Sequence, residues 1–121
     1  MEKSKAESKI QHEIVEYFRN NHCLKIHTPR CVIFSVPNEG KDMMELMFKK
    51  STGLMAGASD LIVVLPGYVV FVEVKDATGR QSDKQKDFEQ QVKLLGFHYY
   101  VVRSLVEFQQ AIEKFLPLRI S

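Results

Sequence analysis

Three charged side chains bound an otherwise apolar stretch of the sequence, DLIVVLPGYVVFVEVK at residues 60–75. Asp60 begins the stretch, and Glu73 and Lys75 lie at its end. Two carboxylates that converge beside an ammonium group can hold a divalent cation and assist hydrolysis at a phosphate. Strand-end charges that turn to solvent and form a simple ion pair would give the same pattern. The chemistry therefore depends on how the chain positions these three side chains.

Pro66 and Gly67 are typical of a tight turn, since Pro suits its second position and Gly its third. A symmetric hairpin around this turn places Asp60 opposite Glu73, with Cβ atoms about 4.5–5.5 Å apart. Lys75 lies two residues beyond Glu73 and so points to the same face. A shared proton, the lysine or a divalent cation must then offset the repulsion between the carboxylates. A hard cation such as Mg²⁺ fits this pair best, because it takes oxygen ligands from one or two carboxylates.

The elements around this hairpin alternate between helical and strand patterns. Both faces of the hairpin are apolar, which is typical of central strands covered on both sides. SDKQ at 82–85 and SLVE at 104–107 are capping boxes that open helices. The predicted helices cover 4–21, 41–50, 82–95 and 104–116, and the predicted strands cover 31–36, 60–65, 68–75 and 97–102. The first helix carries an apolar stripe of Ala6, Ile10, Ile14, Tyr17 and Phe18. The order predicts one α/β domain over residues 1–121, a mixed sheet with helices on its faces.

Composition restricts the class of protein only loosely. The 121 residues carry 17 basic and 15 acidic side chains, a net charge of +2, which neither indicates nor excludes a nucleic-acid partner. No apolar run approaches the roughly 20 residues needed to cross a bilayer, and the N-terminal segment is charged. We therefore expect a cytoplasmic protein with no membrane partner.

Asp60 and the Glu73-Val74-Lys75 triplet resemble the D…(D/E)-x-K core of the PD-(D/E)-x-K nuclease superfamily. In finer detail, residues 8–115 resemble a virus-type replication-repair nuclease (VRR-NUC) domain. The segments that carry this resemblance are Glu13, PNEG at 37–40, GLMAGASDLIVV at 53–64, EVK at 73–75, SDKQ at 82–85 and LLGFHYYVVRS at 94–104. Ser59 departs from the family, which often has proline before the aspartate. The resemblance implies a restriction-endonuclease-like fold with about four strands and helices on both faces.

The resemblance also implies a hydrolase that uses one or two Mg²⁺ or Mn²⁺ ions. The implied ion ligands are Asp60, Glu73, the backbone carbonyl of Val74 and Glu13. Lys75 would orient or activate the attacking water, and Gln85 would lie next to the site. Most helical glutamates are solvated, which is the alternative for Glu13. Gln85 is already explained as a capping residue.

The sequence also suggests contacts with a nucleic acid and with a second copy of the chain. The candidate phosphate contacts are Asn38, Arg80, Lys84 and Lys86, although lysines on helices commonly form solvated faces. The apolar side chains of the 41–50 helix are typical of a core or a dimer contact. Compact relatives are generally homodimers, so we expect a homodimer.

The expected activity is that of a structure-selective DNA endonuclease acting on branched, Holliday-junction-like DNA. The family name associates it with phage replication, recombination and repair, and hence with the host cytoplasm. Three alternatives stay open: a restriction-type or general nuclease on linear DNA, an enzyme that acts on RNA, and a catalytically silent DNA-binding accessory module.

Overall fold

The structure of the protein is a computed structural model, which describes residues 3–37 and 42–117. The elements follow the predicted order, and a short 3-10 helix, η1, extends the last α-helix. The helices are α1 (Lys5–His22), α2 (Met43–Ser51), α3 (Asp83–Leu94), α4 (Leu105–Ile112) and η1 (Glu113–Phe115). The strands are β1 (Val32–Ser35), β2 (Leu61–Leu65), β3 (Tyr68–Val74) and β4 (His98–Val102).

The four strands form one mixed sheet in the order β1-β2-β3-β4. The pairs β1–β2 and β2–β3 are antiparallel, while β3 and β4 run parallel through the α3 crossover. Leu61 pairs with Val72 and Leu65 pairs with Tyr68, which is the register predicted from the turn. Gly67 has φ of 78°, a conformation that suits glycine at the third position of the turn. The hairpin therefore brings position 60 beside position 73.

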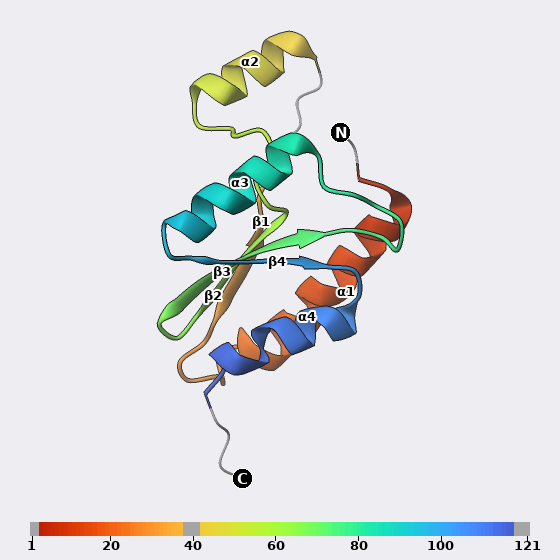
Figure 1. The fold of residues 1–121 in the computed structure, drawn as a ribbon. Helices are drawn as coiled ribbons and strands as arrows, with labels where there is room; N and C mark the ends of the chain where they lie inside the picture. The colour runs from red at the N-terminus through yellow and green to blue at the C-terminus, as the bar shows by residue number, and fades with distance from the viewer. Residues whose placement is uncertain (1–2, 38–41, 118–121) are drawn as a thin grey trace.

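One face of the sheet carries the main core. The helices α1 and α4 cover this face side by side (Figure 1). Ile14 and Phe18 of α1 and Phe108 of α4 are fully buried against it. The sheet contributes the alternating residues Leu61, Val63, Val70, Val72 and Val74, all buried. This buried layer fixes which side chains of the hairpin point away from α1, and those include Glu73.

The opposite face of the sheet is covered only in part. Phe88 and Val92 of α3 pack on Tyr99 of β4 in a second, smaller cluster. On the edge strand β1, Val32 and Phe34 stay half exposed. The helix α2 lies beyond α3, away from the sheet (Figure 1), and buries none of its residues. The edge strand β1 is therefore left partly exposed, because α2 does not pack there.

Helix ends follow the predicted capping, with one difference. At α3, the Ser82 side chain accepts from the Gln85 N–H and the Gln85 side chain accepts from the Ser82 N–H, which completes the box. At α4, the Glu107 carboxylate instead accepts from the N–H of Arg103, at 2.9 Å, so only half of that box forms. Among the described residues, no helix is both long and apolar enough to cross a membrane.

Candidate active site

The open end of the β2–β3 hairpin brings two carboxylates together. Asp60 immediately precedes β2, and its Oδ2 accepts a hydrogen bond of 2.7 Å from the Val74 N–H. Glu73 lies on β3 and is only 1% exposed. The backbone of β3 thus anchors Asp60 beside Glu73, which lies on the same strand. The predicted convergence of charged side chains at this end of the hairpin is present in the structure.

Glu73 lies in an unusual electrostatic environment. Burial raises its pKa from 4.5 to about 8, and the charge of Asp60 adds to the rise, while Lys75 and Lys3 oppose it. Lys75 Nζ lies 3.5 Å from Glu73 Oε2. The other carboxylate oxygen, Oε1, is buried and has no hydrogen-bond partner among the described residues. A buried carboxylate with a free oxygen is a strong potential ligand for a cation.

Gln85 connects the start of α3 to this carboxylate. Its Oε1 accepts from the Ser82 N–H at 2.8 Å, which completes the capping box. Its Nε2 is then free to donate to Glu73 Oε2, also at 2.8 Å. The amide group therefore caps the helix with one atom and orients the glutamate with the other. The two interpretations of Gln85 drawn from the sequence are compatible.

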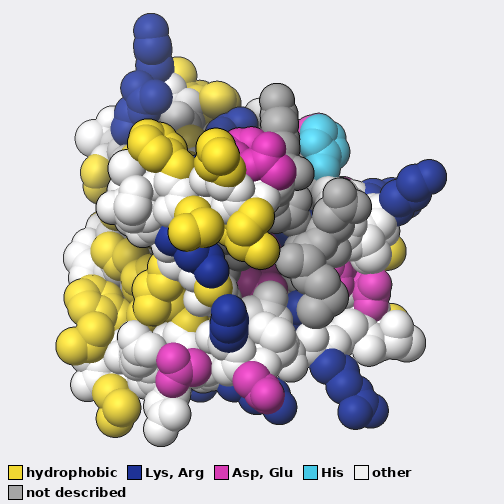
Figure 2. Space-filling view, turned by 90° about the horizontal axis from the view of Figure 1, so that it is seen from above, with side chains coloured by type: hydrophobic (Ala, Val, Ile, Leu, Met, Phe, Trp, Pro, Cys, Tyr) yellow, Lys and Arg dark blue, Asp and Glu magenta, His cyan; other side chains and the backbone are white. Residues whose placement is uncertain are grey.

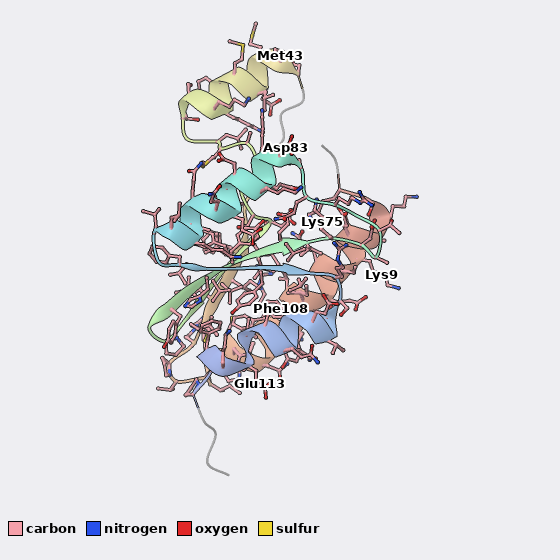
Figure 3. The ribbon with its side chains drawn as sticks, in the orientation of Figure 1. Lys9, Met43, Lys75, Asp83, Phe108 and Glu113 are labelled. Carbon is pink, nitrogen blue, oxygen red and sulfur yellow. The ribbon has the colours of Figure 1, made fainter. Side chains whose placement is uncertain are left out.

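The carboxylates open into a cleft of about 840 Å³. It lies where β3 leaves the sheet and α3 begins, near Lys75 and Asp83 as labelled in Figure 3. Its basic residues come from four parts of the chain: Lys3, Lys50, Lys75, Arg80 and Lys84. A cleft with acidic groups inside and basic groups around them can hold a cation and an anionic substrate together.

The structure brings most of the predicted site residues into this cleft. Those that line it are Asp60, Glu73, Lys75, Gln85, Arg80 and Lys84. The Val74 carbonyl lies beside it and accepts from Lys3 Nζ at 3.3 Å. Glu13 and Lys86 are exposed and do not line the cleft. Asn38 lies outside the described residues.

The position predicted for Glu13 was wrong, because α1 turns a different face toward the cleft. Glu7 and Gln11 line the cleft, at helical spacing with the buried Ile14 and Phe18. Gln11 Oε1 is buried there and has no hydrogen-bond partner within residues 3–37 and 42–117. Ala6, which was predicted to face inward, is exposed. The signal that the sequence analysis overlooked is the helical spacing of positions 7, 11, 14 and 18. It places two polar residues, Glu7 and Gln11, on the same side of α1 as the buried Ile14 and Phe18.

The ligand atoms suit a hard cation with few protein ligands. Within residues 3–37 and 42–117, no three His, Cys, Asp or Glu side chains converge as a metal site. The candidate ligand atoms are the carboxylate oxygens of Asp60 and Glu73 and the carbonyl oxygen of Val74, and the Glu7 carboxylate also lines the cleft. Mg²⁺ is commonly held by one or two carboxylates while it keeps several waters. The buried, unpartnered Glu73 Oε1 is consistent with such an ion, so the residues fit it.

Gly57 sets the distance between the 52–58 loop and α3. It has φ of 84°, and a Cβ there would lie 2.3 Å from the Lys84 carbonyl oxygen and 2.9 Å from the Gln85 N. We expect Gly57→Ala to lower the free energy of unfolding through both backbone strain and a steric clash. The clash alone should contribute about 1–3 kcal/mol. Gly53→Ala is the matched control, since Gly53 also has positive φ, 117°, and a Cβ there would have no atom of the described part of the chain within 4 Å. Equal losses for the two variants in urea unfolding would contradict the close approach.

These features define an α/β protein with a mixed four-stranded sheet and paired carboxylates at the end of its central hairpin. No family model and no curated protein matches the sequence. Two solved structures are similar. One, a "VRR_NUC domain protein", is 19% identical with a TM-score of 0.73, over 94% of this chain and 90% of that chain. The other, a "VRR_NUC domain", is 24% identical with a TM-score of 0.62, over 93% of this chain and 99% of that chain.

The chain therefore has the fold of VRR_NUC domains, a PD-(D/E)XK-like fold. The fold expected from the sequence resemblance is confirmed.

Proposed function

We propose that this protein is a Mg²⁺- or Mn²⁺-dependent DNA endonuclease that cleaves phosphodiester bonds in branched DNA. One observation carries the proposal: Asp60 and the buried Glu73 converge beside Lys75 in a cleft with basic residues around it, on a VRR_NUC fold. The unpartnered Glu73 Oε1 supports an ion in that position.

Asp60, Glu73 and the Val74 carbonyl would hold the ion. When bound, such an ion lowers the pKa of water and stabilises negative charge on phosphate oxygens. Gln85 keeps the Glu73 carboxylate oriented through its 2.8 Å hydrogen bond. Glu7, rather than Glu13, is the acidic residue of α1 that lines the cleft and can join the site, directly or through water.

Lys75 contributes a fixed positive charge. Its side chain is only 11% exposed and lies 3.5 Å from Glu73 Oε2, so its position is constrained. An ammonium group held in this way orients an attacking water and stabilises the charge that develops on the phosphate. Lys75 is therefore proposed as a catalytic residue that is not a ligand of the ion.

The basic residues around the cleft support a nucleic-acid substrate. Arg80 precedes α3, Lys84 lies in its first turn, and Lys50 reaches the cleft from α2. Contacts of this type bind the phosphate backbone independently of sequence. The described elements belong almost entirely to the core fold, which leaves little with which to read bases in a groove. These features favour recognition of DNA structure over sequence.

The direct test is a labelled panel of linear, flap, splayed and four-way DNA, with matched RNA, incubated with and without Mg²⁺ or Mn²⁺. We expect ion-dependent cuts near branch points. Cleavage of linear duplex at one sequence would favour a restriction-type enzyme, and preferential cleavage of the RNA would favour an enzyme that acts on RNA. Binding of junctions without cleavage in either ion would favour a silent accessory module.

We also propose that the protein is a homodimer, because α2 exposes a large apolar surface. Met43, Met44, Met47 and Phe48 are 70%, 81%, 64% and 69% exposed. Hydrophobic side chains gather on the face seen from above, where α2 lies nearest the viewer (Figure 2). Such contiguous apolar surface is typical of protein–protein contacts. A dimer would hold two clefts at a fixed separation, which suits two strands of a junction.

We expect Phe48→Glu to weaken this dimer by at least about tenfold, since it places a charge within an apolar contact. Sedimentation equilibrium over a range of concentrations measures the change. Ile26→Glu is the matched control, because Ile26 is 83% exposed and lies outside α2. If both variants dimerise like the native chain, the interface lies elsewhere. A native chain that stays monomeric would contradict the dimer itself.

A further inference from the structure

An ammonium group contacts two of the groups that are proposed to hold the divalent ion. Lys3 Nζ lies 2.7 Å from Asp60 Oδ2 and 3.3 Å from the Val74 carbonyl oxygen. Its side chain is 24% exposed, so most of it is withdrawn from solvent. Its charge also lowers the pKa of Glu73, opposing the effect of burial. One lysine therefore contacts two of the three groups that would bind the ion and acts electrostatically on the third.

The chain delivers Lys3 to this position through specific contacts of the next residue. Ser4 caps α1 by accepting from the Glu7 N–H, at 3.1 Å, and its hydroxyl donates to Asp76 Oδ2, at 2.9 Å. Asp76 lies two residues beyond the end of β3 and accepts from the N–H groups of Thr78 and Gly79 through its other oxygen. The start of α1 is thus tied to the segment that leaves β3, and Lys3 is held over the carboxylates.

We propose that Lys3 competes with the divalent ion for Asp60 and Val74, so that this residue sets the ion concentration at which the site fills. The proposal rests on the proposed function, because it takes these groups as the ion ligands. Mg²⁺ binds oxygen at 2.0–2.1 Å and requires nearly ideal octahedral geometry. An ammonium 2.7 Å from Asp60 Oδ2 occupies part of that coordination space and repels a second cation. The lysine side chain must withdraw before the ion binds.

Competition has a consequence for the protein without metal. Lys3 offsets the negative charge of Asp60 and lowers the pKa of Glu73, so it stabilises the ionised forms of both groups at the end of the hairpin. Removing its charge should destabilise the metal-free state while it frees ligands for the ion. A lysine that served only to bind substrate phosphate would give a different result: its loss would weaken DNA binding and leave ion binding unchanged.

Isothermal titration of the full chain with Mn²⁺, without DNA, tests the proposal. Lys3→Met keeps most of the side-chain length and removes the charge, and we expect it to bind Mn²⁺ about tenfold more tightly, the scale of one charge-assisted hydrogen bond. Its unfolding midpoint should be lower than that of the native chain in chelator and should rise further on addition of Mn²⁺. Lys5→Met, an exposed lysine at the start of α1, is the matched control and should leave both readouts unchanged.

Asp60→Ala separates failure of this inference from failure of the proposed function. If Asp60→Ala abolishes Mn²⁺ binding but Lys3→Met binds no more tightly than the native chain, the competition is wrong and the metal site stands. If Asp60→Ala binds Mn²⁺ as well as the native chain does, the ligand assignment is wrong and the competition fails with it.

Discussion

Asp60→Ala and Lys75→Ala are both expected to lower ion-dependent DNA cleavage by at least about 10²–10³-fold, the scale of losing one preorganised electrostatic group. Asp60 supplies one of the two carboxylates that converge at the end of the hairpin and is fixed by the 2.7 Å bond from the Val74 N–H. Lys75 supplies the buried ammonium beside Glu73. The two variants should differ in one respect: Lys75→Ala retains Mn²⁺ binding, whereas Asp60→Ala loses it. Cleavage assays and isothermal titration on the same samples measure both properties.

Two controls make this result specific. Asp60→Asn keeps the side-chain volume and an oxygen that can accept from the Val74 N–H, so its fold is preserved while its charge is lost. Lys86→Ala removes an exposed lysine of α3 that does not line the cleft, and it should cleave like the native chain. Full cleavage by Asp60→Ala or Lys75→Ala would show that the chemistry lies elsewhere.

The parts of the structure that the sequence predicts correctly are those with local causes. The Pro66-Gly67 turn fixes the hairpin register within a few residues, and that register alone brings Asp60 beside Glu73. The capping box at Ser82 likewise fixes where α3 begins, and so where Gln85 lies. Each of these needs only neighbouring residues and a known backbone geometry. The central part of the candidate site follows from them.

The parts that sequence reasoning missed depend on contacts across the chain. The family resemblance implies Glu13 as a ligand, but Glu13 is exposed, and the residues of α1 that line the cleft are Glu7 and Gln11. Lys3 reaches Asp60 across 57 positions of sequence, and no local pattern indicates such a contact. The apolar pattern of α2 predicts a helix correctly, but periodicity cannot say what covers its apolar face.

The stability of the metal-free protein should fall as pH rises, because of Glu73. Its pKa in the folded protein is about 8, against about 4.5 when unfolded. Between these values the folded state retains a proton that the unfolded state has released, so the linkage slope is negative. The contribution is fully present below about pH 4.5 and is lost as pH passes through 8. One pKa unit corresponds to about 1.4 kcal/mol, so the loss is on the order of a few kcal/mol.

Glu73→Gln should remove this pH dependence and stabilise the metal-free protein at pH 8.5, because glutamine resembles the protonated acid in size and stays neutral. Urea unfolding in chelator at pH 5, 7 and 8.5 measures the effect. The free energy of unfolding of Glu73→Gln should equal that of the native chain near pH 5 and be larger at pH 8.5. Glu113→Gln, at an exposed position, should show the same pH dependence as the native chain. Parallel curves for the native chain and Glu73→Gln would show that Glu73 is ionised throughout. Added Mn²⁺ should raise the free energy of unfolding of the native chain at pH 8.5 and leave that of Glu73→Gln nearly unchanged. The reason is that an ion bound to the ionised Glu73 carboxylate offsets the cost of burying its charge.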